Sequence, residues 1–379
     1  MFLSVVVCFI ACHGGPADHF STFTEELTRK GYHVQIYATG PALKKCQKRG
    51  IQNVVPFSLE NISEQEAATE LAKKCSCANV IITDVGHVFD VILQKTLQSS
   101  NSTSLRFAYY DNPEGYVPGG YSAVAAQVMR AAQKVLFANA NLVEEPLYQE
   151  PFREFYLPPQ KKIGLGYYPI HQAEHIAQRR ASEQSAIRAQ LFSTYSLTDQ
   201  GQKVLVYAGG NNEEYFSKAL PVFLTFLQGA SQQEDLSRFV VLLQQHPGAK
   251  EKNLDGKLVQ QWLEQHVEKA PPFFISALNV DDAQVVADGM LYYQTSMGPQ
   301  FVLAGIPTIQ VGHHTYEDIL VKNRLCSIVT NVDSLKLALA RLQEDPFVES
   351  GNEAIMQGLG IRPDWANRLE CAMKKVPTK

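Results

Sequence analysis

Residues 287 to 312 constrain the fold of this chain more than any other stretch of its sequence. An apolar run at 290–293 is followed by small and hydroxyl residues, a short helix-like stretch and a second apolar run at 308–311. This order predicts a strand, a turn, a helix and a strand, which is the repeating unit of a parallel sheet. The turn would aim free N–H groups of the helix outward, where they could bind a phosphate. The alternative is an ordinary crossover in which Ser296 only caps the helix.

Strand-like runs recur through both halves of the chain, with helix-like stretches between most of them. Strands that alternate with helices predict an α/β protein whose parallel sheets are covered on both faces. The proline-rich stretch 146–172 predicts a passage between two Rossmann-like, doubly wound domains, residues 1–168 and 169–379, with the last helix able to cross back to the first domain. The expected strands are 3–10, 34–38, 80–83, 106–110, 134–138, 204–208, 239–244, 273–276, 290–293, 308–311 and 326–330.

The composition excludes several classes of protein. With 379 residues, of which 45% are hydrophobic and 19% charged, the chain is long enough for two cores. A net charge of -4 gives no reason to expect a nucleic-acid partner. The seven cysteines form no zinc-type pair, which predicts reduced thiols in a cytoplasmic protein. No apolar run is long enough for a transmembrane helix, although peripheral membrane contact stays open, and the sequence leaves the oligomeric state undecided.

The apolar run at residues 2–12 has two interpretations. It could be the core of a signal peptide, but no Lys or Arg precedes it. It leads directly into a glycine-containing turn at His13, a helix expected from Asp18 to Lys30, and a closing Gly31. A first Rossmann-like strand accounts for this whole order, and we therefore expect the run to be a strand.

Turns that follow strands are the places to look for function, because open parallel sheets bind ligands beyond the carboxyl ends of their strands. Such turns carry two glycines with an asparagine, a histidine before a proline, hydroxyl residues before a short helix, and two carboxylates. For the carboxylates, the alternative is that they only cap the helix at 319–323. The residues of interest are Gly209, Gly210, Asn211, His246, Thr295, Ser296, Met297, Gly298, Glu317 and Asp318.

Together these features resemble the GT-B glycosyltransferases. The similarity covers essentially the whole chain and is most specific at residues 281–323, including Gly305-Ile-Pro307. It implies two Rossmann-like domains facing across a cleft, with a nucleotide-sugar donor on the second domain. Its diphosphate would lie at Gly209, Gly210 and residues 295–298, with His246 on the phosphate and Glu317 and Asp318 facing the donor sugar. The resemblance also implies a UDP-sugar as co-substrate, with neither a metal nor another cofactor.

The chain departs from that family's pattern at two positions. Gln300 stands where many relatives have a glutamate that binds the ribose, and a neutral amide binds a hydroxyl less strongly than a carboxylate does. Pro16 follows two glycines where several relatives have a catalytic histidine. The candidate catalytic residues are therefore His13, Asp18 and His19, with Asp111 and Glu114 on the turn after another strand. For Asp18 the alternative is that it caps the following helix.

Three functions remain open from the sequence. The first is a glycosyltransferase that moves a sugar from a nucleotide diphosphate donor to an unidentified acceptor. The second is a nucleotide-sugar 2-epimerase-like enzyme of the same architecture, for which more acid, base and arginine groups would be expected. The third is a nucleotide-sugar-binding protein without catalysis, which the residues Pro16 and Gln300 suggest. A dinucleotide oxidoreductase is disfavoured because the chain has no Gly-x-Gly-x-x-Gly motif.

Overall fold

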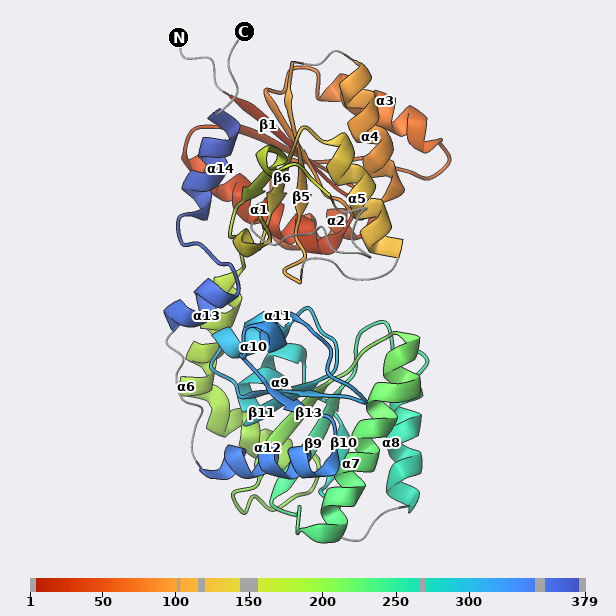
Figure 1. Ribbon diagram of the computed structural model, residues 1–379, viewed down its shortest axis with the longest axis vertical. Coiled ribbons are helices and arrows are strands. Elements are labelled where there is room, and N and C mark those ends of the chain that lie inside the picture. The colour runs from red at the N-terminus through yellow and green to blue at the C-terminus, as the bar shows by residue number, and fades with distance from the viewer. Residues whose placement is uncertain are drawn as a thin grey trace. The chain divides into compact units, whose positions relative to one another are not determined.

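The computed structural model describes residues 5–100, 103–114, 120–143, 156–265, 270–344 and 352–374. The chain divides into two compact units, each with its own parallel sheet (Figure 1). Unit 1 comprises Met1–Tyr168 together with Gly360–Lys379, and unit 2 comprises Pro169–Leu359. The predicted α/β class with two parallel sheets is confirmed.

A seven-stranded parallel sheet forms the centre of unit 1, in the order β3-β2-β1-β4-β5-β6-β7. The apolar run near the N-terminus forms the interior strand β1, so its prediction as a strand is confirmed. The chain leaves β1 toward β2 on one side and later returns to β4 on the other, which makes the β1–β4 junction the switch point of this sheet. The strands are β1 (Val6–Ala11), β2 (His33–Ala38), β3 (Val54–Pro56), β4 (Val80–Thr83), β5 (Leu105–Tyr110), β6 (Lys134–Phe137) and β7 (Lys162–Gly164).

Helices cover both faces of this sheet. Because side chains alternate along a strand, Phe9 and Ile10 of β1 belong to two different cores. Phe9 packs with α1, α2 and α14, and Ile10 packs with α3 and α4. Figure 1 shows α14 and α3 on opposite sides of this sheet. The helices of unit 1 are α1 (Gly14–Arg29), α2 (Gly40–Lys48), α3 (Glu64–Lys74), α4 (Val88–Ser99), α5 (Gly120–Ala131) and α14 (Trp365–Lys374), with the 3-10 turns η1 (Ala140–Val143) and η3 (Pro159–Lys161).

Unit 2 contains a six-stranded parallel sheet in the order β10-β9-β8-β11-β12-β13. Its switch point lies between β8 and β11, because the chain moves from β8 to β9 and β10 before it returns to β11. All six predicted strands are present within a residue or two of their expected ends. They are β8 (Lys203–Ala208), β9 (Phe239–Gln244), β10 (Phe273–Ile275), β11 (Gly289–Tyr292), β12 (Thr308–Val311) and β13 (Ser327–Val329).

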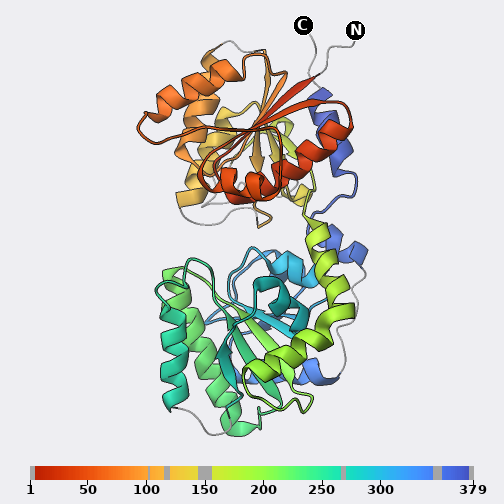
Figure 2. The same cartoon turned by 180° about the vertical axis from the view of Figure 1, so that it is seen from behind.

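Helices also cover both faces of the second sheet. Tyr207 packs with α7, α8 and α12, whereas its neighbour Val206 packs with α6, α9 and α10. The long helix α6 is drawn in yellow-green in Figure 2. The helices of unit 2 are α6 (Ile170–Thr194), α7 (Leu220–Gln233), α8 (Leu254–Gln265), α9 (Val280–Val286), α10 (Gly298–Leu303), α11 (Ile319–Lys322), α12 (Val332–Glu344) and α13 (Asn352–Gly358), with the π-helical turn η4 (Tyr215–Ala219) before α7.

Three sequence-based expectations need correction. The stretch 146–172 contains an element of the first core, since β7 pairs with β6 as the edge strand of the sheet. Strand β3 was also not expected, because three residues are too few to show an alternating pattern. The first helix begins at Gly14 rather than Asp18, so Asp18 does not cap it. In the part of the chain that the structure describes, no helix combines the length and apolarity needed to cross a membrane.

Candidate functional site

The switch point of the first sheet brings together side chains that follow three neighbouring strands. His13 comes after β1, Asp84 after β4 and Asp111 after β5. Asp84 Oδ2 accepts hydrogen bonds from the backbone N–H groups of Cys12 at 2.8 Å and His13 at 3.0 Å. The same oxygen lies 3.3 Å from His13 Nδ1. The imidazole is half-exposed, whereas Asp84 is fully buried, so a buried carboxylate orients a ring that solvent can reach.

A second buried carboxyl group lies behind Asp84. Asp90 is also fully buried, and its Oδ2 accepts from the backbone N–H of His87 at 3.0 Å. Burial, and the charge of Asp84 next to it, raise the pKa of Asp90 well above its usual range. Burial opposes ionisation of Asp84 as well, but hydrogen bonds from His13 and Asp90 outweigh it and leave the pKa of Asp84 below its ordinary value. These opposite shifts favour a protonated Asp90 next to an ionised Asp84.

The interaction with Asp84 changes the pKa of His13. Its hydrogen bond to Asp84 raises the pKa of the imidazole, partial burial opposes the rise, and the charges of Asp84 and Asp111 add to it. The ring is held closely, because a Cβ on Gly86 would lie 2.6 Å from His13 Cε1. A Cβ on Gly15 would likewise lie 2.8 Å from a carboxylate oxygen of Asp111. Gly86 therefore lets its loop lie against the imidazole, and Gly15 lets the start of α1 lie against Asp111.

The other two predicted catalytic residues lie elsewhere on α1. Asp18 is buried and pairs with Arg49 at 3.1 Å and Lys45 at 3.4 Å. Burial raises the pKa of Asp18, but the two cations outweigh it and the net shift is downward, which makes this carboxylate a weaker base. His19 Nδ1 lies 2.8 Å from the hydroxyl of Tyr109. His13 combines a half-exposed ring with a buried carboxylate partner, which suits acid–base chemistry, whereas the partner of the partly exposed His19 is a tyrosine hydroxyl.

In unit 2, the turns after β8 and β9 lie next to each other. They line a pocket of about 450 Å³ that includes Asn211 and Gly248. A Cβ on Gly209 would lie 3.0 Å from Gln244 O, and one on Gly210 would lie 2.8 Å from Tyr215 Cγ. Protein atoms therefore already explain why both residues are glycine. The pocket is lined by Asn211, Glu213, Phe216, Ser217, Gly248, Ala249, Lys252 and Leu254.

The proposed phosphate-binding residues follow β9 and β11, at the carboxyl edge of the second sheet. His246 is exposed, and its Nδ1 accepts from the backbone N–H of Gly248 at 3.0 Å, so that the other ring nitrogen is left to donate. Ser296 is exposed too, but the N-cap of α10 is Met297, so the alternative of a serine cap is wrong. Thr295 Oγ1 instead accepts from Met297 N at 3.2 Å. A phosphate at this turn stays a prediction.

Gln300 and Asp318 are both buried. Gln300 is 8% exposed and its amide donates to Gln284 Oε1 at 3.0 Å, which does not favour contact with a ribose. Asp318 is 4% exposed and caps α11 through the N–H of Val321, so the capping interpretation is confirmed for this residue. Its other oxygen accepts from the hydroxyl of Tyr292 at 2.7 Å and from Gln310 at 3.0 Å. Burial raises the pKa of Asp318 despite these bonds.

Glu317 differs from its neighbour Asp318. It is exposed on the turn that follows β12, where its carboxylate faces solvent. Of the two carboxylates predicted to face a donor sugar, Glu317 is therefore the one whose oxygens remain accessible. Its contact with a sugar stays a prediction.

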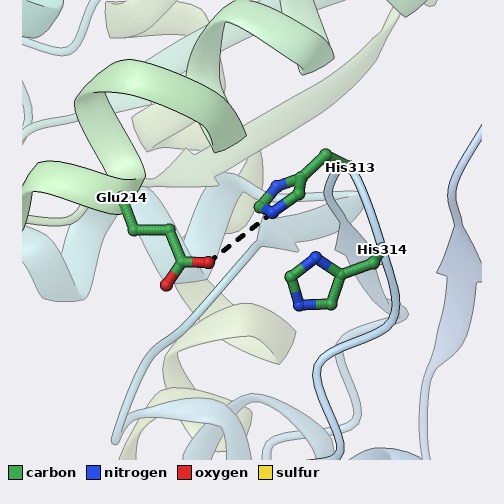
Figure 3. A group of neighbouring side chains, drawn as sticks. All are labelled: Glu214, His313 and His314. Carbon is green, nitrogen blue, oxygen red and sulfur yellow. Dashed lines mark ion pairs between the residues drawn. The ribbon is translucent and has the colours of Figure 1, made fainter.

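Sequence reasoning missed a second ionisable group of residues in unit 2. Glu214, at the end of the turn after β8, has its Oε1 3.6 Å from His313 Nε2 on the turn after β12 (Figure 3). The hydroxyl of Tyr293, which follows β11 between those strands, lies 3.1 Å from Glu214 Oε1 and 3.2 Å from His314 Nε2. The available signal was position. Tyr293 directly follows β11, His313 and His314 lie on the turn after β12, and Glu214 lies at the start of the helix that follows β8.

Asp84 and Asp90 were missed for a different reason. Asp84 directly follows the predicted strand at 80–83, a signal that could have been used. Asp90 lies in the first turn of α4. Nothing in a single sequence indicates that its carboxyl group meets that of Asp84. Cys12, Asp84 and Asp90 approach one another within 4.8 Å, but all three are buried and burial raises the pKa of the Cys12 thiol, which disfavours a metal there.

The sequence matches no family model and no curated protein. Among solved structures, the chain is similar to UDP-GlcNAc 2-epimerase from Methanocaldococcus jannaschii, with a TM-score of 0.66 and 10% identity over 98% of this chain and 100% of that chain. It is similar to UDP-N-acetylglucosamine 2-epimerase from Rickettsia bellii, with a TM-score of 0.63 and 12% identity over 98% of this chain and 96% of that chain. It is also similar to UDP-GlcNAc 2-epimerase from Neisseria meningitidis bound to UDP-GlcNAc. The TM-score is 0.62 and the identity 10%, over 98% of this chain and 100% of that chain.

This chain has a GT-B-like fold. The resemblance to GT-B proteins that the sequence predicted is therefore confirmed at the level of the fold. At identities near one residue in ten, structural likeness establishes the fold and leaves the reaction to be argued from the site.

Proposed function

We propose that this chain is an enzyme that acts on a UDP-sugar through acid–base chemistry, with His13 as the acid–base group. The observation that carries this proposal is the pairing of a half-exposed imidazole with a buried carboxylate at the switch point of the first sheet. Open α/β sheets bind their ligands at that position. A UDP-sugar is proposed because the chain shares its fold with UDP-GlcNAc 2-epimerases.

Asp84 would determine which nitrogen of His13 does the chemistry. Since Nδ1 faces the Asp84 carboxylate, Nε2 is the nitrogen left to take a proton from a substrate or return one. The raised pKa of His13 keeps a larger share of the ring protonated near neutral pH than an unpartnered imidazole would have. Asp90, which retains its own proton, would hold Asp84 in place from the buried side.

The leading reaction is epimerisation at C2 of the sugar, as the names of the similar structures suggest. Inverting that carbon requires the loss of its proton and the return of a proton to the opposite face, which calls for acid–base groups on both sides. His87 offers a second imidazole whose ring centre lies 6.3 Å from that of His13. The site thus has more acid–base groups than the sequence alone had suggested.

A glycosyltransferase is the second candidate, and the same pairing supports it. Deprotonating an acceptor hydroxyl requires only one base, and an imidazole oriented by a carboxylate is well suited to that step. The donor would then use the exposed residues at the carboxyl edge of the second sheet, among them Asn211, His246 and Ser296. A nucleotide-sugar-binding protein without catalysis is the third outcome that an experiment has to separate.

The deciding experiment incubates the full chain with UDP-GlcNAc in D₂O and follows the sugar nucleotide by NMR and mass spectrometry. Deuterium at C2 together with the C2 epimer would establish the epimerase. UDP release without deuterium in the remaining substrate would favour transfer or hydrolysis. Saturable binding without either change would favour the third outcome, and no binding of UDP or UDP-GlcNAc would overturn the proposal.

His13, the N-cap residue of α1, and His19, inside that helix, provide a matched test of the active residue. We expect His13→Ala to lower the rate by about 10²- to 10⁴-fold, the usual contribution of a general acid or base, while His19→Ala retains it. A larger loss in His19→Ala than in His13→Ala would overturn the assignment to His13.

The donor side is tested separately, by calorimetric titration of UDP against Ser296→Ala and His246→Ala. Both side chains are exposed, so the substitutions should leave the fold intact while UDP affinity falls. Unchanged affinity in both variants would remove the phosphate assignment, whatever the outcome for His13.

A further inference from the structure

Glu214, His313 and His314 form the most concentrated set of metal-ligand side chains that solvent can reach in the described part of the chain. One ligand atom from each residue lies within 4.8 Å of the other two. Glu214 and His313 are half-buried and His314 is exposed, so an ion can reach them from solvent. Figure 3 shows both imidazole rings on the side of their loop that faces the Glu214 carboxylate.

The spacing of these atoms is close to that of a zinc site. Zn²⁺ binds imidazole nitrogens and carboxylate oxygens at about 2.0–2.2 Å, so that tetrahedral ligand atoms lie roughly 3.4 Å apart. His313 Nε2 and Glu214 Oε1 are separated by 3.6 Å, which is within a few tenths of that value. The three ligand atoms all lie within 4.8 Å of one another, and the exposure of His314 on a turn lets its ring move closer to the other two.

The surrounding structure holds Glu214 and His314 next to each other without a metal. The hydroxyl of Tyr293, whose ring is buried, contacts both Glu214 and His314. A side chain on Gly312 would collide with the Tyr293 ring, so this glycine allows the next two residues to lie against it. Glu214 also directly precedes the π-helical turn η4, and such rare turns are frequent at functional sites.

The chemistry of the three side chains suits a transition metal. Two imidazoles and one carboxylate suit zinc or a related transition metal, whereas Mg²⁺ and Ca²⁺ prefer sites made of oxygen atoms.

We propose that Glu214, His313 and His314 bind a transition-metal ion of the Zn²⁺ type, with a water molecule as the fourth ligand. The carboxylate supplies one negative charge and the two rings supply neutral nitrogens, so the site would carry a net charge of +1 when filled. This proposal does not depend on the UDP-sugar reaction, because its site is defined by side chains of unit 2 alone.

The test titrates Co²⁺, and then competing Zn²⁺, into the chelator-treated full chain. The exposed thiols of Cys77 and Cys371 would also bind these ions, so both are first replaced by serine. We expect one equivalent of Co²⁺ with the visible absorption of a four-coordinate site, displaced by Zn²⁺. Absence of stoichiometric binding in this background would overturn the proposal.

Variants separate the site from other surface histidines. Glu214→Gln, which keeps the shape of the side chain, and His313→Ala should each abolish the four-coordinate spectrum. His246→Ala, which changes an exposed histidine on another turn of unit 2, should retain it. We expect Tyr293→Phe to weaken binding by about 10- to 100-fold, as loss of a group that orients metal ligands does. Binding that survives both Glu214→Gln and His313→Ala would also overturn the proposal.

Discussion

The switch points of the two sheets place ionisable groups at the same topological position, but these groups are fully buried in unit 1 and partly exposed to solvent in unit 2. In unit 1, Asp84 and Asp90 are fully buried and are held by backbone N–H groups. In unit 2, Glu214 and His313 are half-buried, and a single tyrosine hydroxyl connects Glu214 with His314. Burial therefore sets the protonation of the first group, while access to solvent leaves the second able to accept a ligand.

The difference in burial gives the two groups of side chains different physical properties. A buried carboxylate that accepts several hydrogen bonds has a defined charge, and removing it leaves its donors without partners. Exposed side chains contribute little to stability and can rearrange around an ion. The predictions below test this contrast, using Trp365 of unit 1 and Trp262 of unit 2 as separate fluorescent reporters, because the chain has only two tryptophans.

The largest effect is expected from Asp84→Ala. This change leaves the N–H groups of Cys12 and His13 without their acceptor and removes the charge opposite the imidazole. Loss of one partner from a buried network should lower the free energy of unfolding of unit 1 by about 3–5 kcal/mol. Urea denaturation of the Trp262→Phe background, followed by the fluorescence of Trp365, measures this loss of stability. A loss below about 1 kcal/mol would mean that Asp84 is not buried as described.

A buried carboxylate of unit 2 should show the next largest effect. Asp318→Ala removes the cap of α11 and leaves Tyr292 and Gln310 without an acceptor, for an expected loss of about 2–3 kcal/mol. Denaturation of the Trp365→Phe background, read through Trp262, reports this loss. If Asp318→Ala had no effect on stability but reduced affinity for a UDP-sugar, the donor-sugar role predicted from the sequence would be favoured over capping.

The proton on Asp90 predicts a dependence of stability on pH. Because its pKa is raised in the folded state, folded unit 1 keeps a proton that the unfolded chain releases above the ordinary Asp range. The free energy of unfolding should therefore fall as pH rises, by about 1.4 kcal/mol per pH unit for this one proton. Asp90→Asn, which mimics the protonated form, should remove that slope.

The best window for this comparison is about pH 4.5 to 6, between the ordinary pKa values of Asp and His. The lowered pKa of Asp84 acts below this window, where its contribution to stability is lost as pH falls. The raised pKa of His13 acts above it, where that contribution is lost as pH rises. Equal slopes for the wild type and Asp90→Asn within the window would show that Asp90 is ionised in the folded protein.

The smallest effect is expected from Glu214→Gln. The side chain is 38% exposed and its contacts are long or shared with solvent, so stability of unit 2 should change by no more than about 0.5 kcal/mol. The measurement is the same Trp262-based denaturation used for Asp318→Ala. A loss as large as that of Asp318→Ala would remove the contrast between the two switch points and make Glu214 a structural residue.

Much of the fold could be predicted from local patterns. Strand β4 lies at the expected residues 80–83, and β12 at 308–311, because a buried strand is a short apolar run bounded by turn residues. Strands β3 and β7 have three residues each and lie at the edges of the first sheet, where neither length nor pattern is distinctive. Their pairing depends on the sheet already being present.

The candidate site was predictable only in part. His13 and the turns after the strands could be identified, because parallel strands bring their carboxyl ends to one edge of a sheet. The partners of these residues could not. Asp18 was favoured as a base from its position, yet α2 brings Lys45 and its C-cap Arg49 against it. Gln300 was expected at a ribose, yet it turns toward Gln284.

The sequence by itself determined the α/β class, the order of most strands and helices, and the edges at which function should be sought, because all of these follow from the period and chemistry of neighbouring residues. Tertiary structure alone decided that the buried carboxyl groups of Asp84 and Asp90 meet behind His13 with opposite shifts in pKa, and that Glu214 lies near two histidines some hundred residues further along the chain. The physical reason is that a carboxylate's charge, proton and partners depend on burial and on the groups that folding brings within a few ångströms of it.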